Sequence, residues 1–335
     1  MPDPRVTVVV PTLAGGDVLG ECLSALSRQT YRDFEAVVVD NSCLERVPKT
    51  NLPEFVRVLA SPRNLGYGGA INFAGRESRS EFIAALNDDA VAHPGWLGAL
   101  VAAAGSQPQA GMWASCVRLS ESEMDSAGML LYGDGSSRQR GHRRPPREFA
   151  GAAEILMPSG SAALYRRTML ERIGGFDEEF FLYCEDTDLG LRAQWAGWQC
   201  AYVPDAVVDH RYSQSAGRVS PLKAYYVERN RLRVAIKNFP ASMLLPAPLH
   251  AVSRYAWHLL TLMSGRGAAG EFHNSGGSPF LLVWLVARAH ASALWNLPRL
   301  WSARRRIRRS AAIPASRFIE LAKRHSLTAR EVATL

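Results

Sequence analysis

The chain has 335 residues, of which 47% are hydrophobic and 21% are charged. This composition excludes a disordered chain and provides enough apolar residues for one large domain or two smaller ones. The five cysteines are odd in number and include no CxxC pair, so the sequence indicates neither a disulfide framework nor a cysteine zinc site, and a reducing cytosol fits. The first residues, MPDPRVTVVVPTL, contain too short an apolar run for a signal peptide.

The positive charge of the chain is unevenly distributed. The net charge is +8 overall, but residues 1–210 have a net charge of −8 and residues 211–335 a net charge of +16. A basic segment attached to an acidic body predicts an anionic partner for that segment. At this point nucleic acid and an anionic membrane are both candidates.

The first hundred residues alternate between predicted strands and predicted helices. Apolar, β-branched runs predict buried strands at residues 6–10, 34–39, 55–59 and 82–86. Helices are predicted at residues 17–29, 94–104 and, after a glycine-rich turn NLGYGG, at 70–78. This alternation predicts an open, mainly parallel α/β sheet flanked by helices. Ligands of such sheets bind at the carboxyl ends of the strands, where Thr12, Asp40 and the pair Asp88–Asp89 are expected to converge.

Residues 119–150 are polar and contain several glycines and prolines, which predicts a mobile loop. The loop carries a basic cluster: Arg138, Arg140, Arg143, Arg144 and Arg147. Two interpretations stand open, a solvated loop and a flap over an anionic ligand. After the loop, β structure is expected around 155–165, a helix at 186–196, and short strands at 200–203 and 206–209, followed by His210.

The last hundred residues are expected to be helical and amphipathic. Helices are predicted at 221–238, 241–264 and 279–301, and the last two are rich in Leu, Ala and Trp but interrupted by Arg and His. The longest uninterrupted apolar run, PFLLVWLVA, is shorter than the roughly 20 residues that span a bilayer. The run RRRIRR follows. These features favour an anchor on an anionic membrane surface, and the alternative is a helical cap or a dimer contact.

The stretch FFLYCEDTDLGLR places Glu185, Asp186 and Asp188 directly after an aromatic run. Acids at a helix start commonly complement the helix dipole. Acids in apolar surroundings also become better bases, which favours a catalytic role. The same two kinds of interpretation apply to Asp88–Asp89, as a turn or as a cation site, and to His210, as a core histidine or as a ligand.

Several segments in series resemble one enzyme family. They are VVVPTLAGGDVLGECLSALSRQTYRDFEAVVVDNS, NLGYGGAINFA, FIAALNDDAVAHPGWL, SGSAALYRRTMLERIGGFDEEFFLYCEDTDLGLRAQWAGWQCAYVPDAVVDH and YYVERNRLRVAIKNFP. The chain resembles family 2 inverting glycosyltransferases with the GT-A fold, and most of all their bacterial rhamnosyltransferase-like branch. The resemblance covers residues 6–239, with 119–150 poorly matched. It implies a Rossmann-like GT-A domain at 1–239 and leaves a helical, amphipathic region at 240–335.

The resemblance implies a role for each matched residue. The nucleotide-sugar side would comprise Pro11, Thr12, Asp40, Arg63, Asn64, Gly69 and Asp88, with Asp40 accepting from the pyrimidine base. Mg²⁺ or Mn²⁺ would be held by Asp89, with His210 completing the site. Asp186 matches the family's catalytic base, with Glu185 beside it. Asp188 is expected to orient the base or to cap the helix. The acceptor side would include Ser159, Gly160 and Ser161.

The expected reaction is transfer of a sugar, such as rhamnose, from a dTDP- or UDP-linked donor to a glycan or lipid-linked acceptor. It would occur at the inner face of the plasma membrane, with the protein cytoplasmic and peripherally bound. A single displacement with one base inverts the anomeric centre. The alternatives are a metal-dependent sugar nucleotidyltransferase and a basic-tailed nucleic-acid-binding protein. A nucleotidyltransferase would need a basic residue in its phosphate-binding loop, and the corresponding segment PTLAGGDVLGE has none. A nucleic-acid-binding protein is disfavoured because the acidic body of the chain would repel phosphate. The oligomeric state stays open.

Overall fold

The computed structural model describes residues 3–50, 52–211, 220–263 and 278–334. The chain forms two compact units, each built from several segments. The sheet unit comprises Met1–Gly128, Gln139–Phe181 and Trp198–Ser215. The helical unit comprises Met129–Arg138, Leu182–Gly197 and Ala216–Leu335. The boundary expected between residues 239 and 240 stays a prediction.

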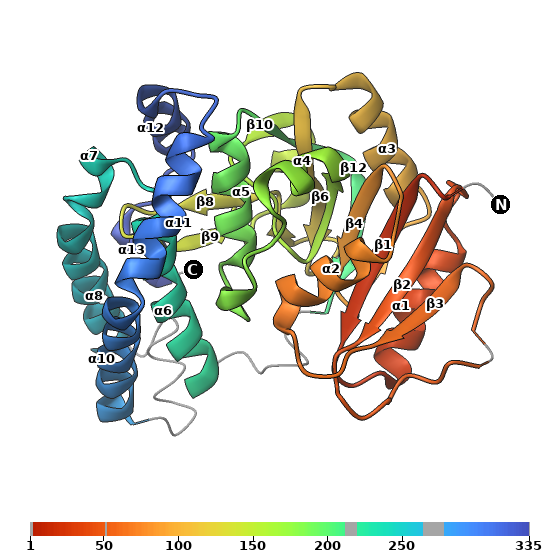
Figure 1. The fold of residues 1–335 in the computed structure, drawn as a ribbon, viewed down its shortest axis with the longest axis horizontal. Coiled ribbons are helices and arrows are strands. Elements are labelled where there is room, and N and C mark those ends of the chain that lie inside the picture. The colour runs from red at the N-terminus through yellow and green to blue at the C-terminus, as the bar shows by residue number, and fades with distance from the viewer. Residues whose placement is uncertain (1–2, 51, 212–219, 264–277, 335) are drawn as a thin grey trace. The chain divides into compact units, whose positions relative to one another are not determined.

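The sheet unit is built on the strands expected from the first apolar runs (Figure 1). They are β1 (Val6–Thr12), β2 (Phe34–Asp40), β3 (Val56–Ala60) and β4 (Phe82–Leu86). β1 pairs in parallel with both β2 and β4, and β2 pairs in parallel with β3. Valines fill β1 and β2 because both faces of the sheet are covered, and branched side chains pack well on a pleated surface.

The other half of the sheet contains antiparallel pairs. Its strands are β5 (Ala90–Ala92), β6 (Ala110–Arg118), β7 (Met124–Ser126), β10 (Ala153–Ile155), β11 (Ala162–Arg166) and β12 (Gln199–His210). The central order is β10-β12-β6-β11-β4-β1-β2-β3. β12 is one strand where two short ones were expected, because the register against β6 shifts between Val203 and Val207 and the strand continues past the irregularity. The expected α/β class is therefore confirmed, with a mixed sheet.

The helices of the sheet unit connect these strands. They are α1 (Gly16–Ser27), α2 (Gly66–Arg76), α3 (Trp96–Ser106) and α4 (Arg167–Ile173), with short 3₁₀ turns η1 (Pro146–Phe149) and η2 (Glu178–Phe180). α2 begins four residues earlier than expected, inside NLGYGG. Gly66 has a φ of +71°, and a Cβ there would lie 2.1 Å from the carbonyl oxygen of Phe181, so this position requires glycine.

Regular structure occurs in residues 119–150, where a polar loop was expected. The segment contains β7, the two-stranded pair β8 (Met129–Leu131) and β9 (Ser137–Gln139), and η1. Met124, Asp125 and Asp134 are buried. The loop assignment was therefore wrong for much of the segment, because buried tertiary partners stabilise short strands that local composition does not reveal. The flap stays a prediction.

The helical unit contains most of the chain after residue 220 (Figure 1). Its helices are α5 (Glu185–Trp195), α6 (Pro221–Asn238), α7 (Ala241–Leu244), α8 (Ala247–Met263), α10 (Pro279–Trp295), α11 (Leu297–Arg309), α12 (Ala315–Arg324) and α13 (Ala329–Thr334). α6 packs against α10 and α11, and α13 packs against α8. The helix expected at 279–301 is two helices, because Pro298 has no N–H to donate to the carbonyl of Leu294 and its ring clashes with that carbonyl, so a new helix begins at Leu297.

Across the described ranges, 3–50, 52–211, 220–263 and 278–334, no single helix is both long and apolar enough to cross a bilayer. The bent pair Phe280–Trp295 and Leu297–Arg309 satisfies the length and composition criteria only when its two helices are taken together, and they meet at 63°.

Buried ion pairs hold the helical unit together. Asp188 of α5 is fully buried and lies 2.7 Å from the Nε of Arg192 and 2.8 Å from the Nζ of Lys237 in α6. Burial alone would raise the pKa of Asp188, but the charges of Lys237 and Arg192 hold it at about 2. A second network joins Glu228 and Asp134 to Arg231 and Arg254. These pairs fix α6 in register with its neighbours.

We predict that Asp188→Asn destabilises the protein by about 3–5 kcal/mol in urea unfolding at pH 7, because it removes the carboxylate charge that faces two buried cations. The folded pKa of Asp188 is about 2 against an ordinary 3.8, so the folded state binds fewer protons in that interval. Stability from Asp188 is therefore complete above the ordinary pKa and is lost as pH falls from about 5 toward 2. This acid-dependent loss should be smaller in the variant.

Glu320→Gln is the matched control. Glu320 contacts Arg317 and Arg324 on the exposed surface of α12, where water screens the charges. This variant should unfold at the wild-type urea concentration. Equal losses in the two variants would contradict the structural role assigned to Asp188.

Candidate functional site

The carboxyl ends of β1, β2 and β4 bring polar side chains together at one edge of the sheet unit. Thr12 pairs with Asp40 in the parallel register of β1 and β2, and the N–H of Asn41 donates to the carbonyl of Thr12 at 2.8 Å. The Thr12 hydroxyl donates to the Oδ2 of Asp88 at 2.6 Å. The expected convergence of Thr12, Asp40 and Asp88 is therefore observed.

Asp40 is buried and held by the loop that follows β2. Its Oδ1 accepts from the N–H and the hydroxyl of Ser42, and its Oδ2 accepts from the N–H of Val47 at 2.9 Å. Burial alone would raise the pKa of Asp40, but these hydrogen bonds together lower it. The ionised side chain thus holds the loop in place through hydrogen bonds. Its contact with a nucleotide base stays a prediction.

The other residues expected on the nucleotide side lie along the same part of the sheet unit. Pro11 is half-buried in β1, and Arg63 is exposed after β3. The Oδ1 of Asn64 accepts from the Nδ2 of Asn41 at 3.1 Å and from the N–H of Gly66 at 2.9 Å. Gly69 is buried in α2, and its side-chain direction is closed by Leu65. The turn before α2 is therefore tied to the end of β2.

Asp88 and Asp89 follow β4 as adjacent acids. Burial raises the pKa of Asp88, and the neighbouring Asp89 carboxylate raises it further, while the Thr12 hydrogen bond opposes both effects. Asp89 is buried, and its backbone carbonyl accepts from the N–H of Arg211 at 3.1 Å. Two neighbouring carboxylates with little access to water favour a cation between or beside them.

His210, at the end of β12, lies between two carboxylates. Its Nε2 is 3.1 Å from the Oδ1 of Asp89, and its Nδ1 is 2.9 Å from the Oδ2 of Asp125. The amide of Asn87 also lies 3.2 Å from Nε2. Burial alone would lower the pKa of His210, but the hydrogen bonds with Asp125 and Asp89 raise it to about 9. In this arrangement the imidazolium supplies the positive charge that the acids need.

Asp125 is the site residue that the sequence analysis missed. It is buried in β7, and besides His210 it contacts the Nδ1 of His142 at 3.2 Å. Its pKa is lowered, since the hydrogen bonds with His142 and His210 outweigh the effect of burial. The sequence signal was weak, a single acid between Met124 and Ser126 in a polar segment, and the contact with His210 spans 85 positions.

Asp89 and His210 together offer two ligands to a divalent cation. Among the described residues, no group of three or more His, Cys, Asp and Glu side chains is placed to hold a metal. Two ligands suit Mg²⁺ or Mn²⁺, which commonly complete their coordination with water and substrate phosphates. The donor set therefore fits such an ion.

The expected acceptor loop, Ser159 to Ser161, lies beside the acid pair. The carbonyl of Ser161 accepts from the N–H of Asn87 at 2.9 Å, directly before Asp88. The hydroxyl of Tyr67 in α2 donates to the carbonyl of Gly160. These bonds place the loop at the same strand end as the acids, and its contact with an acceptor stays a prediction.

Glu185 and Asp186 begin α5 in the helical unit and have different environments. Glu185 is buried, and its Oε2 has no hydrogen-bond partner among the described residues. Burial, and secondarily the charge of Asp186, raise the pKa of Glu185 to about 8. Asp186 is half-buried, and its Oδ1 accepts from the N–H of Thr187 at 2.6 Å. At neutral pH, Glu185 therefore retains its proton.

The backbone that leads into α5 is strained. Tyr183 and Cys184 have φ values of 66° and 63°, in the left-handed region that side chains other than glycine rarely adopt. The Nδ2 of Asn230 in α6 donates to the carbonyls of Leu182 and Tyr183, at 2.8 and 2.7 Å. Asn230 is fully buried, and the Nε of Arg229 donates to its Oδ1. Strain held by a buried clamp is typical of functional turns.

Comparison with known proteins identifies the family. The model of the family described as "Glycosyltransferase like family 2" matches residues 4–234. The N-acetylglucosaminyl-diphospho-decaprenol L-rhamnosyltransferase of Mycobacterium tuberculosis is 33% identical over 237 residues, which cover 63% of this chain and 77% of that protein.

Solved structures show the same fold at low identity. The mannosyltransferase PcManGT from Pyrobaculum calidifontis, in complex with GDP-Man and Mn²⁺, has a TM-score of 0.53 and 21% identity, covering 94% of this chain and 87% of that chain. GalNAc-T7 with UDP, GalNAc and Mn²⁺ has a TM-score of 0.55 and 14% identity, covering 70% and 49%. The GT-A-like architecture expected from the sequence is thereby confirmed. The chain belongs to glycosyltransferase family 2 and is a glycosyltransferase of its rhamnosyltransferase-like branch.

Proposed function

We propose that the protein transfers a sugar from a nucleotide-diphosphate donor to a hydroxyl of a glycan or lipid-linked acceptor, with inversion at the anomeric carbon. The observation that carries this proposal is the acid edge of the sheet unit, where Asp88 contacts Thr12 and Asp89 contacts His210. In a family 2 glycosyltransferase, such an edge suits a donor diphosphate whose charge must be neutralised before it can leave.

The similar M. tuberculosis enzyme suggests the donor and acceptor classes. Its name describes transfer of L-rhamnose to a diphospho-decaprenol that carries N-acetylglucosamine. We therefore propose rhamnose on a dTDP or UDP carrier as the donor and a lipid-linked saccharide as the acceptor. The lipid would hold the acceptor in the membrane, so we place the enzyme at the inner face of the plasma membrane as a peripheral, cytoplasmic protein.

A divalent ion, Mg²⁺ or Mn²⁺, would be held by Asp89 and by His210, whose Nε2 would release its proton when the ion binds. When bound, the ion would neutralise charge on the leaving diphosphate. Asp125 accepts the Nδ1–H of His210 and so leaves Nε2 facing Asp89. A carboxylate that orients a ligating histidine in this way is common in metal sites. Thr12 holds the Asp88 carboxylate beside the pair.

Asp186 would accept the proton of the acceptor hydroxyl. Glu185, the other acid at this helix start, has a pKa of about 8 and is mostly protonated at neutral pH, so it cannot serve as the base there. Asp186 is half-buried and remains accessible. Its neighbour instead provides a neutral side chain, which adds no second negative charge next to the base.

We predict that Asp186→Asn lowers kcat by about 10²–10⁴-fold, because the base is lost, while the affinity for the nucleotide diphosphate stays at the wild-type value. Glu185→Gln is the matched control, since glutamine imitates a protonated glutamate, and it should retain kcat within about tenfold. Turnover assays and calorimetric binding measure the two quantities. A Glu185→Gln variant as inactive as Asp186→Asn would contradict the division of roles.

We predict that Asn230→Asp lowers kcat by about 10–100-fold with unchanged nucleotide-diphosphate affinity, because the strained turn before Asp186 loses both of its amide donors. Asn230→Ser retains one hydrogen-bond donor, so its kcat should lie between those of Asn230→Asp and wild type. Asn296→Asp is the control, since Asn296 donates to the carbonyl of Ser292 at the end of α10. A parallel loss of nucleotide affinity and kcat would indicate general unfolding instead of a misplaced turn.

We predict that Asp125→Asn weakens Mn²⁺ binding by about 10–100-fold, because His210 loses the carboxylate that orients it. Electron paramagnetic resonance of free Mn²⁺, in the presence of nucleotide diphosphate, measures the affinity without turnover. His142→Gln is the control, since His142 contacts the Oδ1 of Asp125, whereas His210 contacts its Oδ2. Equal losses in both variants would assign Asp125 a purely structural role.

A further inference from the structure

α10 exposes an apolar row along its length in addition to the face that it buries. The buried residues are Leu285, Ala289 and Ala293. The exposed large residues, termed the α10 row, are Phe280, Val283, Trp284, Leu294 and Trp295, with exposed alanines at 287 and 291 between them. Their spacing of three, four, seven and eleven positions places them on one side of the helix. Trp295 is 88% exposed and Phe280 is 87% exposed.

Exposed apolar residues also occur on α8 of the same unit. Leu249, Val252, Leu259 and Leu260 are more than half exposed, again at helical spacing. Isolated exposed leucines are common on soluble proteins, but rows of large exposed apolar residues along two helices of one unit are not. Such rows mark a surface that contacts another apolar phase.

The sequence around these rows is strongly basic. Between Phe239 and Ile319 the sequence contains one acid, Glu271, and ten arginines. No Asp or Glu occurs in α8, α10 or α11. α11 carries six arginines, and the exposed ones are Arg299, Arg305, Arg306 and Arg309. Arginines beside exposed tryptophans match the interface of an anionic bilayer, where the headgroups attract the guanidinium groups and the acyl chains accept the rings.

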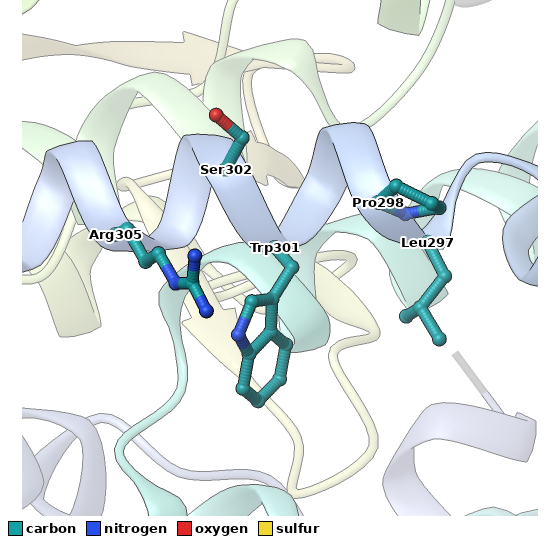
Figure 2. Close-up of a pocket in the computed structure, with 5 residues that line it drawn as sticks. All are labelled: Leu297, Pro298, Trp301, Ser302 and Arg305. Atoms are coloured by element: carbon teal, nitrogen blue, oxygen red, sulfur yellow. The ribbon is translucent and has the colours of Figure 1, made fainter.

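α11 continues this pattern after the bend at Asn296. Leu297, Trp301 and Arg305 project from the same side of the helix, and together with Pro298 and Ser302 they line an open hollow of about 530 Å³ (Figure 2). All of these residues come from α11, so the hollow is a surface feature and not an enclosed pocket. This order places an aliphatic side chain, an indole and a guanidinium along one side of α11. Such a series fits a lipid interface, in which apolar groups lie deeper and charged groups lie at the headgroups.

We propose that α10 and α11 bind the surface of an anionic phospholipid bilayer, with the α10 row inserted among the acyl chains and the exposed arginines of α11 at the headgroups. The arginines of α11 make insertion of that helix across the hydrocarbon core costly, so the contact lies at the interface. The inference rests on the proposed function only for its purpose, which is to bring the enzyme to a lipid-linked acceptor.

The test is flotation of the full-length protein with vesicles of phosphatidylcholine containing phosphatidylglycerol, compared with pure phosphatidylcholine. Wild type should float with the anionic vesicles and about tenfold less with the neutral ones. In the triple variant Val283→Ser, Leu294→Ser, Trp295→Ser, the fraction bound to anionic vesicles should fall at least about tenfold. The triple variant Arg305→Glu, Arg306→Glu, Arg309→Glu should lose a comparable fraction of its vesicle binding. High salt should reduce the vesicle binding of wild type by a comparable amount, because it screens the arginine charges.

Leu44→Ser combined with Leu222→Ser is the control, because both leucines are exposed and lie outside α8, α10 and α11. It should float like wild type. Turnover of a water-soluble acceptor should be unchanged in the triple variant, which separates loss of lipid binding from loss of catalysis. Absence of transfer by wild type, with flotation intact, would overturn the proposed function alone. If wild type fails to float with anionic vesicles, and the same residues instead mediate self-association or DNA binding, the proposed lipid-binding role of α10 and α11 is wrong.

Discussion

The acid edge of the sheet unit depends on one electrostatic constraint, the need of buried carboxylates for positive charge. Asp88, Asp89 and Asp125 are all removed from water to a large extent. The positive charge comes from His210, whose two ring nitrogens contact two of these acids. The acids come from different elements, since Asp88 and Asp89 follow β4 and Asp125 lies in the antiparallel strand β7, and His210 at the end of β12 lies between Asp89 and Asp125. We propose a nucleotide diphosphate with its divalent ion as the ligand of this edge.

The strand-end residues were predictable because their positions follow from local pattern. Thr12 and Asp40 each end an apolar run, and parallel pairing then aligns them without further information. Asp125 was not predictable, because its role depends on a contact with His210 across 85 positions. Neighbouring composition pointed to a loop, whereas burial of β7 against β6 decides the structure. Local sequence therefore indicates where a parallel sheet ends, and not which distant side chain completes the edge.

The three acids of the α5 start show the same limit in another form. The sequence gives them similar chemistry, but the structure gives each a different charge state. Asp188 faces two cations and has a pKa of about 2, whereas Glu185 is buried without such a partner and has a pKa of about 8. Asp186 is half-buried between them. Only tertiary surroundings distinguish a structural anion, a neutral acid and a candidate base within four positions.

The central claim is that the acid edge accommodates a nucleotide diphosphate together with a divalent ion. Calorimetric titration of the wild-type protein with dTDP or UDP, in Mn²⁺ and then in excess chelator, tests it most directly. The account predicts that affinity falls at least about tenfold when the ion is removed, since the acids then face the diphosphate with only His210 to offset them. Equal affinity in the two conditions would contradict it.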